Sequence, residues 1–291
     1  MKKLKQIFTE IKSNSSHTAD ELNQLLWQLI CYSPKMPVRF QQQQLLDEAE
    51  KFSLKANDDY FAHKELTFNG FKWGNGKLKI LITHGWGSKA ADFTELTTAL
   101  RGIDDLEIIA FDAPGNGSSE GELSNLLLYI QAVKAIKLNY GNPDVLIGHS
   151  LGGMANMLAI KETMVKPSLL ISLTPLIRLK ENFEASMNAA DVPQPAQEAY
   201  LKSFETHFGK PAAYYNLIDL YNFAGRHYLA YDRHDLISPY NCIEEFINAN
   251  SSIESHNYEN TGHEKIIKSP EVINDMVMQI KNLVLTGYRQ S

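Results

Sequence analysis

The chain has 291 residues, of which 44% are hydrophobic and 21% are charged. This balance is typical of a globular protein and excludes a chain that is mostly disordered or fibrous. The 28 basic and 34 acidic residues give a formal net charge of −6. That charge argues against a nucleic-acid binder, which needs a basic face to displace counterions.

The number of cysteines and the first residues indicate the cellular compartment of the protein. Cys31 and Cys242 could form one disulfide, but so few cysteines favour a reducing compartment. No apolar run reaches the roughly 18 residues of a membrane span. Residues 1–8 are basic, yet they lack the apolar stretch of a secretory signal. We therefore expect a cytoplasmic protein with no stable membrane insertion, and the sequence leaves its oligomeric state open.

Residues 1–55 are predicted to form an N-terminal helical extension. Thr18 and Glu21 fit a capping box, in which each side chain accepts a hydrogen bond from a free backbone amide. An apolar stripe then runs to Pro34, which ends that helix, and a further helix is expected over residues 38–55. The basic first turn could touch a membrane surface, but its small charge favours a helix docked on the core.

Residues 56–291 are predicted to form an α/β domain. Residues 61–73 alternate loosely between apolar and polar, which is typical of a hairpin-like pair of strands. Short apolar runs follow, each with a turn and a helical stretch behind it, at residues 79–83, 107–111, 144–147, 168–173 and 227–231. Such units build a mostly parallel, doubly wound sheet, and its ligands bind beyond the C-terminal strand ends.

Residues 176–225 interrupt the series of strand–helix units, because these roughly fifty positions carry no strand pattern. Pro193 and Pro195 divide the stretch into two helical halves, and both halves contain aromatic residues. A long excursion from a compact domain is usually functional, so we expect a cap over the site. A packed excursion unrelated to any site is the alternative.

The central motif is a G-x-S-x-G sequence formed by Gly148, Ser150 and Gly152. A strand-like run precedes it and a helical run follows it, which is the context of a nucleophile elbow. The serine of such an elbow lies in a strained turn, and the two glycines avoid clashes where helix and strand meet. A glycine-rich turn with an idle serine is the alternative.

A second glycine-rich turn follows the run at residues 79–83. It contains His84, Gly85 and Trp86, and its backbone N–H groups could bind the oxygen of a tetrahedral intermediate. The natural pair of donors is the amide of Trp86 and the amide of Leu151, just past the nucleophile. We expect His84 itself to be a hydrogen-bonded turn residue without a catalytic role.

These motifs resemble those of the α/β-hydrolase superfamily, and the resemblance covers residues 60–291. It includes the turn at His84, the run D-A-P-G-N-G-S at residues 112–118, and the serine elbow. The resemblance implies an α/β-hydrolase fold with a triad in the chain order serine, acid, histidine. Serine in place of aspartate at the elbow argues against the dehalogenase and epoxide-hydrolase branches.

The acid implied by the resemblance follows the next-to-last strand, where two aspartates compete. Asp235 fits the family position, because Pro239 stands four residues beyond it. Asp232 would then occupy the preceding turn as an Asx-turn residue, which needs no catalytic function. We therefore expect Asp235 to be the acid.

The histidine implied by the resemblance follows the last strand, which is expected over residues 252–258. Gly262 and His263 match the family position in the loop after that strand. His256 lies inside the strand pattern, and we expect it to be a surface or packed histidine. The predicted base is therefore His263.

These residue types predict a serine hydrolase. His263 would take the proton of the Ser150 hydroxyl, Asp235 would orient the imidazole, and water would release the acyl group. We expect a small-molecule carboxylic ester or thioester with a small or medium apolar acyl group. Metal-binding and nucleotide-binding motifs are absent from the sequence, so no metal and no cofactor are expected.

Two other functions fit the same residues. The first is a non-catalytic ligand-binding module, because a fold does not by itself imply an activity. The second is an acyltransferase that passes the same acyl-enzyme to an acceptor other than water. The sequence also leaves open the natural substrate, its acyl length, and whether an ester, amide or carbon–carbon bond is cleaved.

Overall fold

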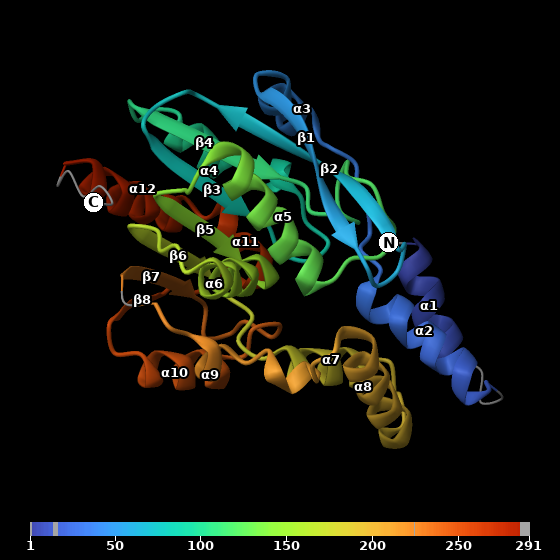
Figure 1. Ribbon diagram of the computed structural model, residues 1–291. Coiled ribbons are helices and arrows are strands. Elements are labelled where there is room, and N and C mark those ends of the chain that lie inside the picture. Colours follow the sequence, from blue (N-terminus) through green and yellow to red (C-terminus); the bar gives the residue numbers. More distant parts are fainter. Residues whose placement is uncertain (1, 14–16, 224, 286–291) are drawn as a thin grey trace.

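A computed structural model of the chain describes residues 2–13, 17–223 and 225–285. Its centre is an eight-stranded sheet with the order β1-β2-β4-β3-β5-β6-β7-β8 (Figure 1). The strands from β3 to β8 are parallel, and β1 and β2 are antiparallel to their neighbours. The strands are β1 (Glu50–Asp58), β2 (Lys64–Trp73), β3 (Leu78–Thr83), β4 (Leu106–Phe111), β5 (Val145–His149), β6 (Leu169–Leu173), β7 (Arg226–Tyr231) and β8 (Ile253–Asn257).

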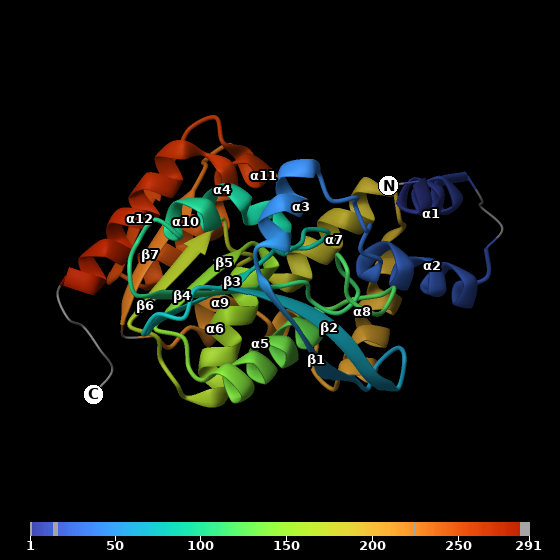
Figure 2. The same cartoon turned by 90° about the horizontal axis from the view of Figure 1, so that it is seen from above.

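Helices cover both faces of this sheet (Figure 2). On one face lie α5 (Leu126–Tyr140), α6 (Leu151–Thr163) and α10 (Tyr240–Ala249). On the other face lie α4 (Thr94–Leu100) and α12 (Pro270–Leu285). Every residue of β5 and β6 is buried, as expected for central parallel strands that are covered on both sides. The predicted doubly wound, mostly parallel sheet is therefore confirmed.

The prediction for residues 38–73 was wrong in two respects. The helix expected over residues 38–55 is the shorter α3 (Phe40–Asp47), and the sheet begins at Glu50, so the expected boundary at residue 55 falls inside β1. The hairpin expected within residues 61–73 is instead β2 alone, paired with β1. Polar and apolar residues alternate along β1, because one of its faces is exposed.

Two helices precede these strands, α1 (Lys2–Ser13) and α2 (Ala19–Cys31). The capping box predicted at the start of α2 is confirmed: Thr18 accepts from the Glu21 amide at 3.3 Å, and Glu21 accepts from the Thr18 amide at 2.9 Å. Among the described residues, none of these helices or the later ones is long and apolar enough to cross a membrane.

The chain between β6 and β7 forms α7 (Leu179–Ala189), α8 (Gln194–Phe208), the short η2 (Ala212–Tyr214) and α9 (Leu217–Leu220). Pro193 is the N-cap of α8 and Pro195 lies in its first turn, where a missing N–H is harmless. Both views place α7 and α8 beside α1 and α2 (Figures 1 and 2). These four helices share one apolar core, which continues to α5 and α6.

Candidate active site

Ser150 lies between the end of β5 and the start of α6. Its backbone has φ 51° and ψ −120°, a strained conformation for a residue with a side chain. Glycines make this turn possible. A Cβ atom on Gly152 would lie 2.4 Å from the Thr83 carbonyl oxygen, and one on Gly148 would lie 2.6 Å from the Gly153 Cα. The structure therefore has the tight strand–turn–helix geometry that the motif predicts.

The loops after β7 and β8 bring Asp235 and His263 together. Asp235 Oδ2 lies 2.7 Å from His263 Nδ1, and the Asp235 side chain is fully buried. The other carboxylate oxygen accepts hydrogen bonds from the amides of Ile237, at 2.7 Å, and Ser238, at 3.0 Å. With Nδ1 engaged as a donor to the carboxylate, Nε2 of the neutral ring is free to accept a proton.

Asp232 has a different environment from Asp235. Its Oδ2 accepts from the backbone N–H groups of Thr261, at 2.9 Å, and Gly262, at 2.7 Å, and its Oδ1 accepts from that of His234 at 2.9 Å. Burial alone would raise the pKa of Asp232, but these hydrogen bonds lower it below its ordinary value. Asp232 therefore holds the loop that carries His263 without contacting the His263 ring.

The turn after β3 reaches the elbow from the neighbouring strand. A Cβ atom on Gly85 would lie 2.7 Å from His149 Nδ1 and 3.1 Å from Ser150 Cβ, so a larger residue would displace these neighbours. His84 Nδ1 lies 2.6 Å from the Gly85 carbonyl oxygen, and the Tyr129 hydroxyl donates to the same oxygen at 3.0 Å. His84 Nε2 accepts from the Ala113 amide at 2.9 Å, so Nδ1 carries the hydrogen. His84 is thus a buried, hydrogen-bonded turn residue, as expected.

These contacts orient the peptide between Gly85 and Trp86. In a trans peptide, the carbonyl and the N–H point in opposite directions. Since His84 and Tyr129 hold the Gly85 carbonyl, the Trp86 N–H points away from them, and no acceptor among the described residues binds it. Leu151 is the first residue of α6, where N–H groups lack intrahelical partners. Both predicted oxyanion donors are therefore free backbone amides next to Ser150.

His149 was not singled out by the sequence analysis, although it lies inside the elbow motif. Its Nε2 donates to the His263 carbonyl oxygen at 2.8 Å, and its ring centre lies 4.8 Å from that of His263. Burial and the neighbouring His263 lower the pKa of His149 to about 3, so this ring stays neutral near pH 7. Tyr129 was also missed, because only the tertiary fold brings it to Gly85.

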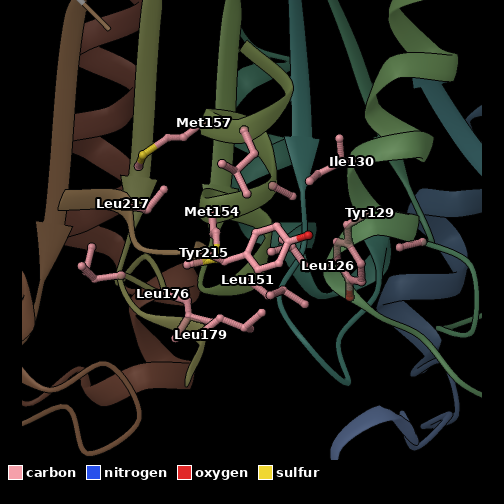
Figure 3. Packing of buried hydrophobic residues seen from close by; sticks show 14 of the residues in the cluster. Leu126, Tyr129, Ile130, Leu151, Met154, Met157, Leu176, Leu179, Tyr215 and Leu217 are labelled. Atoms are coloured by element: carbon pink, nitrogen blue, oxygen red, sulfur yellow. The ribbon is translucent and has the colours of Figure 1, made fainter. Parts of the chain in front are cut away.

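Ser150 and His263 line one cavity of about 870 Å³. This volume lies in the upper part of the range for small-molecule sites. The cavity wall is mostly apolar where α2, α5, α7 and α8 form it. Its charged residues are Arg39, just before α3, and residues of the segments around η1 (Ala90–Phe93) and η3 (Ile266–Lys268). Figure 3 shows part of the apolar side, where Tyr215 lies among Leu126, Leu151 and Leu176. Within the described residues, no group of His, Cys, Asp and Glu side chains is arranged to hold a metal ion.

Solved structures with the same fold include enzymes named as esterases. An esterase from Pyrococcus furiosus aligns with a TM-score of 0.61 and 17% identity, over 88% of this chain and 98% of that chain. An esterase from Thermogutta terrifontis aligns with a TM-score of 0.57 and 16% identity, over 82% of this chain and 100% of that one. At such low identity, these similarities support the fold alone.

Curated relatives match a shorter region. The monoglyceride lipase of Mus musculus is 34% identical over 114 residues, and that of Homo sapiens is 32% identical over 112 residues. Each match covers 36% of this chain and 37% of the relative.

The sequence profile of the alpha/beta hydrolase family matches residues 80–250. This region contains the turn at Gly85 and Trp86, the serine elbow and Asp235, and it is more than half of the chain. Together with the sheet order and the elbow geometry, the match assigns the family. The chain belongs to the alpha/beta hydrolase family.

Proposed function

We propose that this protein hydrolyses carboxylic esters through an acyl-enzyme formed on Ser150. The observation that carries the proposal is the 2.7 Å contact between Asp235 and His263, in the same cavity as a serine at a strained elbow. The esterase and lipase names of the similar proteins support the same reaction class.

The first chemical step is acyl transfer to the serine. His263 Nε2 takes the proton of the Ser150 hydroxyl as the oxygen attacks the ester carbonyl. The buried Asp235 carboxylate orients the ring and stabilises the imidazolium that forms. His263 then gives the proton to the departing alcohol, which leaves the acyl group on Ser150. In the second step, water attacks this ester, and the same proton transfers release the carboxylic acid.

The amides of Trp86 and Leu151 would stabilise the tetrahedral intermediates of both steps. Each donor of this kind contributes about 10²–10³ in kcat in comparable sites. His84 and Tyr129 fix the peptide that carries the first donor, so this amide is oriented before charge develops on the substrate oxygen.

The substrate we propose is a small-molecule ester with a small or medium apolar acyl group. The apolar side of the cavity suits such an acyl group, and Phe183 and Phe204 contribute to this wall. We further propose that α7 and α8 act as the cap over this site. A thioester would fit the same chemistry, because its carbonyl is attacked in the same way.

The first experiment is intact-mass spectrometry after incubation with a fluorophosphonate, on the wild type and on Ser150→Ala. A single adduct on the wild type that is lost in the variant is expected, together with loss of hydrolysis of p-nitrophenyl butyrate. Thermal unfolding of the variant controls for its fold. A folded wild type that forms no adduct and cleaves no ester would favour a ligand-binding module. Ester products with added alcohols would instead indicate an acyltransferase.

A further inference from the structure

We propose that helix α2 forms one wall of the acyl-binding chamber and thereby limits the length of acyl chain that the enzyme accepts. The inference rests on the proposed ester hydrolysis at Ser150 and goes beyond it. It assigns a role to the N-terminal helices and makes the length of the acyl chain the substrate property that they limit.

The first observation is the lining of the cavity. Leu29, Ile30 and Cys31, at the end of α2, line the same cavity as Ser150. All three side chains are buried, with 3–9% of their surface exposed. Phe204 and Phe208 of α8 line this cavity as well. The chamber therefore has walls from two distant parts of the chain, one on each of the helices α2 and α8.

The second observation is an aromatic cluster where these two walls meet. The ring of Trp27 lies 4.9 Å from that of Tyr200, 5.8 Å from that of Phe208 and 6.2 Å from that of Phe204, measured between ring centres. Tyr60 adds another ring at 4.5 Å from Phe208. Rings at these distances are in contact and leave no space for a chain between them. The cluster therefore closes the chamber between α2 and α8.

The third observation is that polar contacts attach α1 and α2 to the segment after β6. Asn23 donates to Ser203 of α8 at 3.3 Å. Lys12, at the end of α1, forms an ion pair of 2.6 Å with Asp191, which precedes α8. These contacts add to the apolar packing of Trp27, so α2 and α8 form one unit.

The same wall is also attached to the hydrolase core. The Cys31 carbonyl accepts a hydrogen bond from the Ser124 amide at 2.8 Å, and Ser33 donates to Asn116 at 2.5 Å. Both partners lie in the loop between β4 and α5, which leads directly to the cavity. The wall is thus held from two sides, and a rigid wall discriminates between ligands by size.

These wall residues lie outside the region that matches the family. The profile begins at residue 80, whereas the part of α2 that lines the cavity ends at Cys31. The family match therefore implies nothing about this wall. The proposal makes the acyl-length preference a property of the N-terminal helices.

The test is to narrow the chamber from the α2 side. In Ile30→Phe, the phenyl ring is larger than the isoleucine side chain, so it would occupy space that an acyl chain needs. A difference of one methylene between two substrates of an apolar pocket already changes kcat/KM by about tenfold or more. We expect the ratio of kcat/KM for p-nitrophenyl dodecanoate to that for the butyrate to fall at least about tenfold. Gln24→Phe is the matched control, because Gln24 lies on the same helix and is exposed.

A second variant and a binding measurement test the same wall independently. Leu29→Phe narrows the same cavity from the same helix, and it replaces Ile30→Phe if that variant does not fold. Dodecanoate binding to Ser150→Ala, with and without Ile30→Phe, measures the chamber without catalysis. Weaker binding only in the double variant supports the chamber, even if the wild type forms no fluorophosphonate adduct and the proposed hydrolysis fails. An unchanged chain-length ratio and unchanged dodecanoate binding in the folded variants would overturn the role of α2.

Discussion

The loops that carry the proposed triad and the chamber beside them are held together by different forces. Asp235, Asp232 and His149 are fixed through hydrogen bonds to backbone groups, and the elbow depends on glycines that allow close backbone contact. The chamber is held mainly by aromatic and aliphatic side chains from α2, α7 and α8. Hydrogen bonds specify position and direction, whereas apolar packing specifies volume. Substitutions in the first region should therefore affect the rate, and those in the second should affect stability and substrate range.

The largest effect is expected at the acid. Asp235→Asn should lower kcat by about 10⁴, because the amide no longer holds His263 in the right tautomer. Asp232→Asn should cost far less, since Asp232 supports the loop and does not contact the ring. Esterase kinetics on both variants test this ranking, and circular dichroism controls for their fold. The reverse order would transfer the role of the acid to Asp232.

The next largest effect is expected in the chamber, where a substitution should lower stability without slowing the chemical steps. Phe204→Ala removes a buried ring, with 4% of its surface exposed, from the contacts with Trp27 and Phe208. We expect the free energy of unfolding to fall by about 3–5 kcal/mol. Turnover of p-nitrophenyl acetate should stay within about threefold of the wild type, a barrier change well below 1.4 kcal/mol. Urea unfolding and steady-state kinetics measure both quantities. A stable variant with a large loss of acetate turnover would contradict the division between the two regions.

A smaller effect is expected at Tyr129, which supports the proposed oxyanion turn. Tyr129→Phe removes one of three donors to the Gly85 carbonyl and leaves His84 Nδ1, at 2.6 Å, and the Ser88 amide, at 3.3 Å, in place. We expect kcat to fall by about tenfold at most, since a single neutral hydrogen bond contributes about 0.5–1.5 kcal/mol. KM should change little, because Tyr129 contacts the turn and does not line the cavity. A change in KM with constant kcat would indicate a role in binding instead.

The smallest effect concerns acid stability. Burial lowers the pKa of His149 and of His227 to about 3, whereas an unfolded histidine has a pKa of about 6.5. Below pH 6.5, the unfolded state therefore binds more protons, so stability falls with falling pH until the folded-state pKa is reached. Each histidine contributes a slope of at most about 1.36 kcal/mol per pH unit.

His227→Gln isolates one of these contributions. His227 lies between Ser172 and Tyr221, and both of its ring nitrogens form hydrogen bonds of 2.9 Å. Neither partner is a residue of the proposed triad. Urea unfolding between pH 6.5 and pH 5 should show a shallower slope in this variant than in the wild type. Carboxylates titrate mostly below this window, so they do not obscure the difference. Equal slopes in the two proteins would mean that His227 binds a proton in the folded state as readily as in the unfolded state between pH 6.5 and pH 5.

The accuracy of the sequence-based predictions depended on the strength of the local pattern. β3, β4 and β7 begin one residue before their predicted starts and end where predicted, because buried parallel strands are continuous apolar runs bounded by turns. The first six residues of β1 were predicted as helix, although Phe52, Leu54 and Ala56 alternate with polar residues in the pattern of a half-exposed strand. That alternation is the signal that could have located it.

The amino-acid sequence by itself determined the order of the motifs, the elbow glycines, the capping box of α2 and the two competing aspartates. These features are local, since each depends on residues a few positions apart. The contact of Asp235 with His263, the support of Gly85 by Tyr129, and the joint wall of α2 and α8 were decided only by the tertiary structure. Each of these contacts joins residues that are far apart in the chain, so no local pattern encodes it. Only the packing of helices on the twisted sheet brings their side chains within reach.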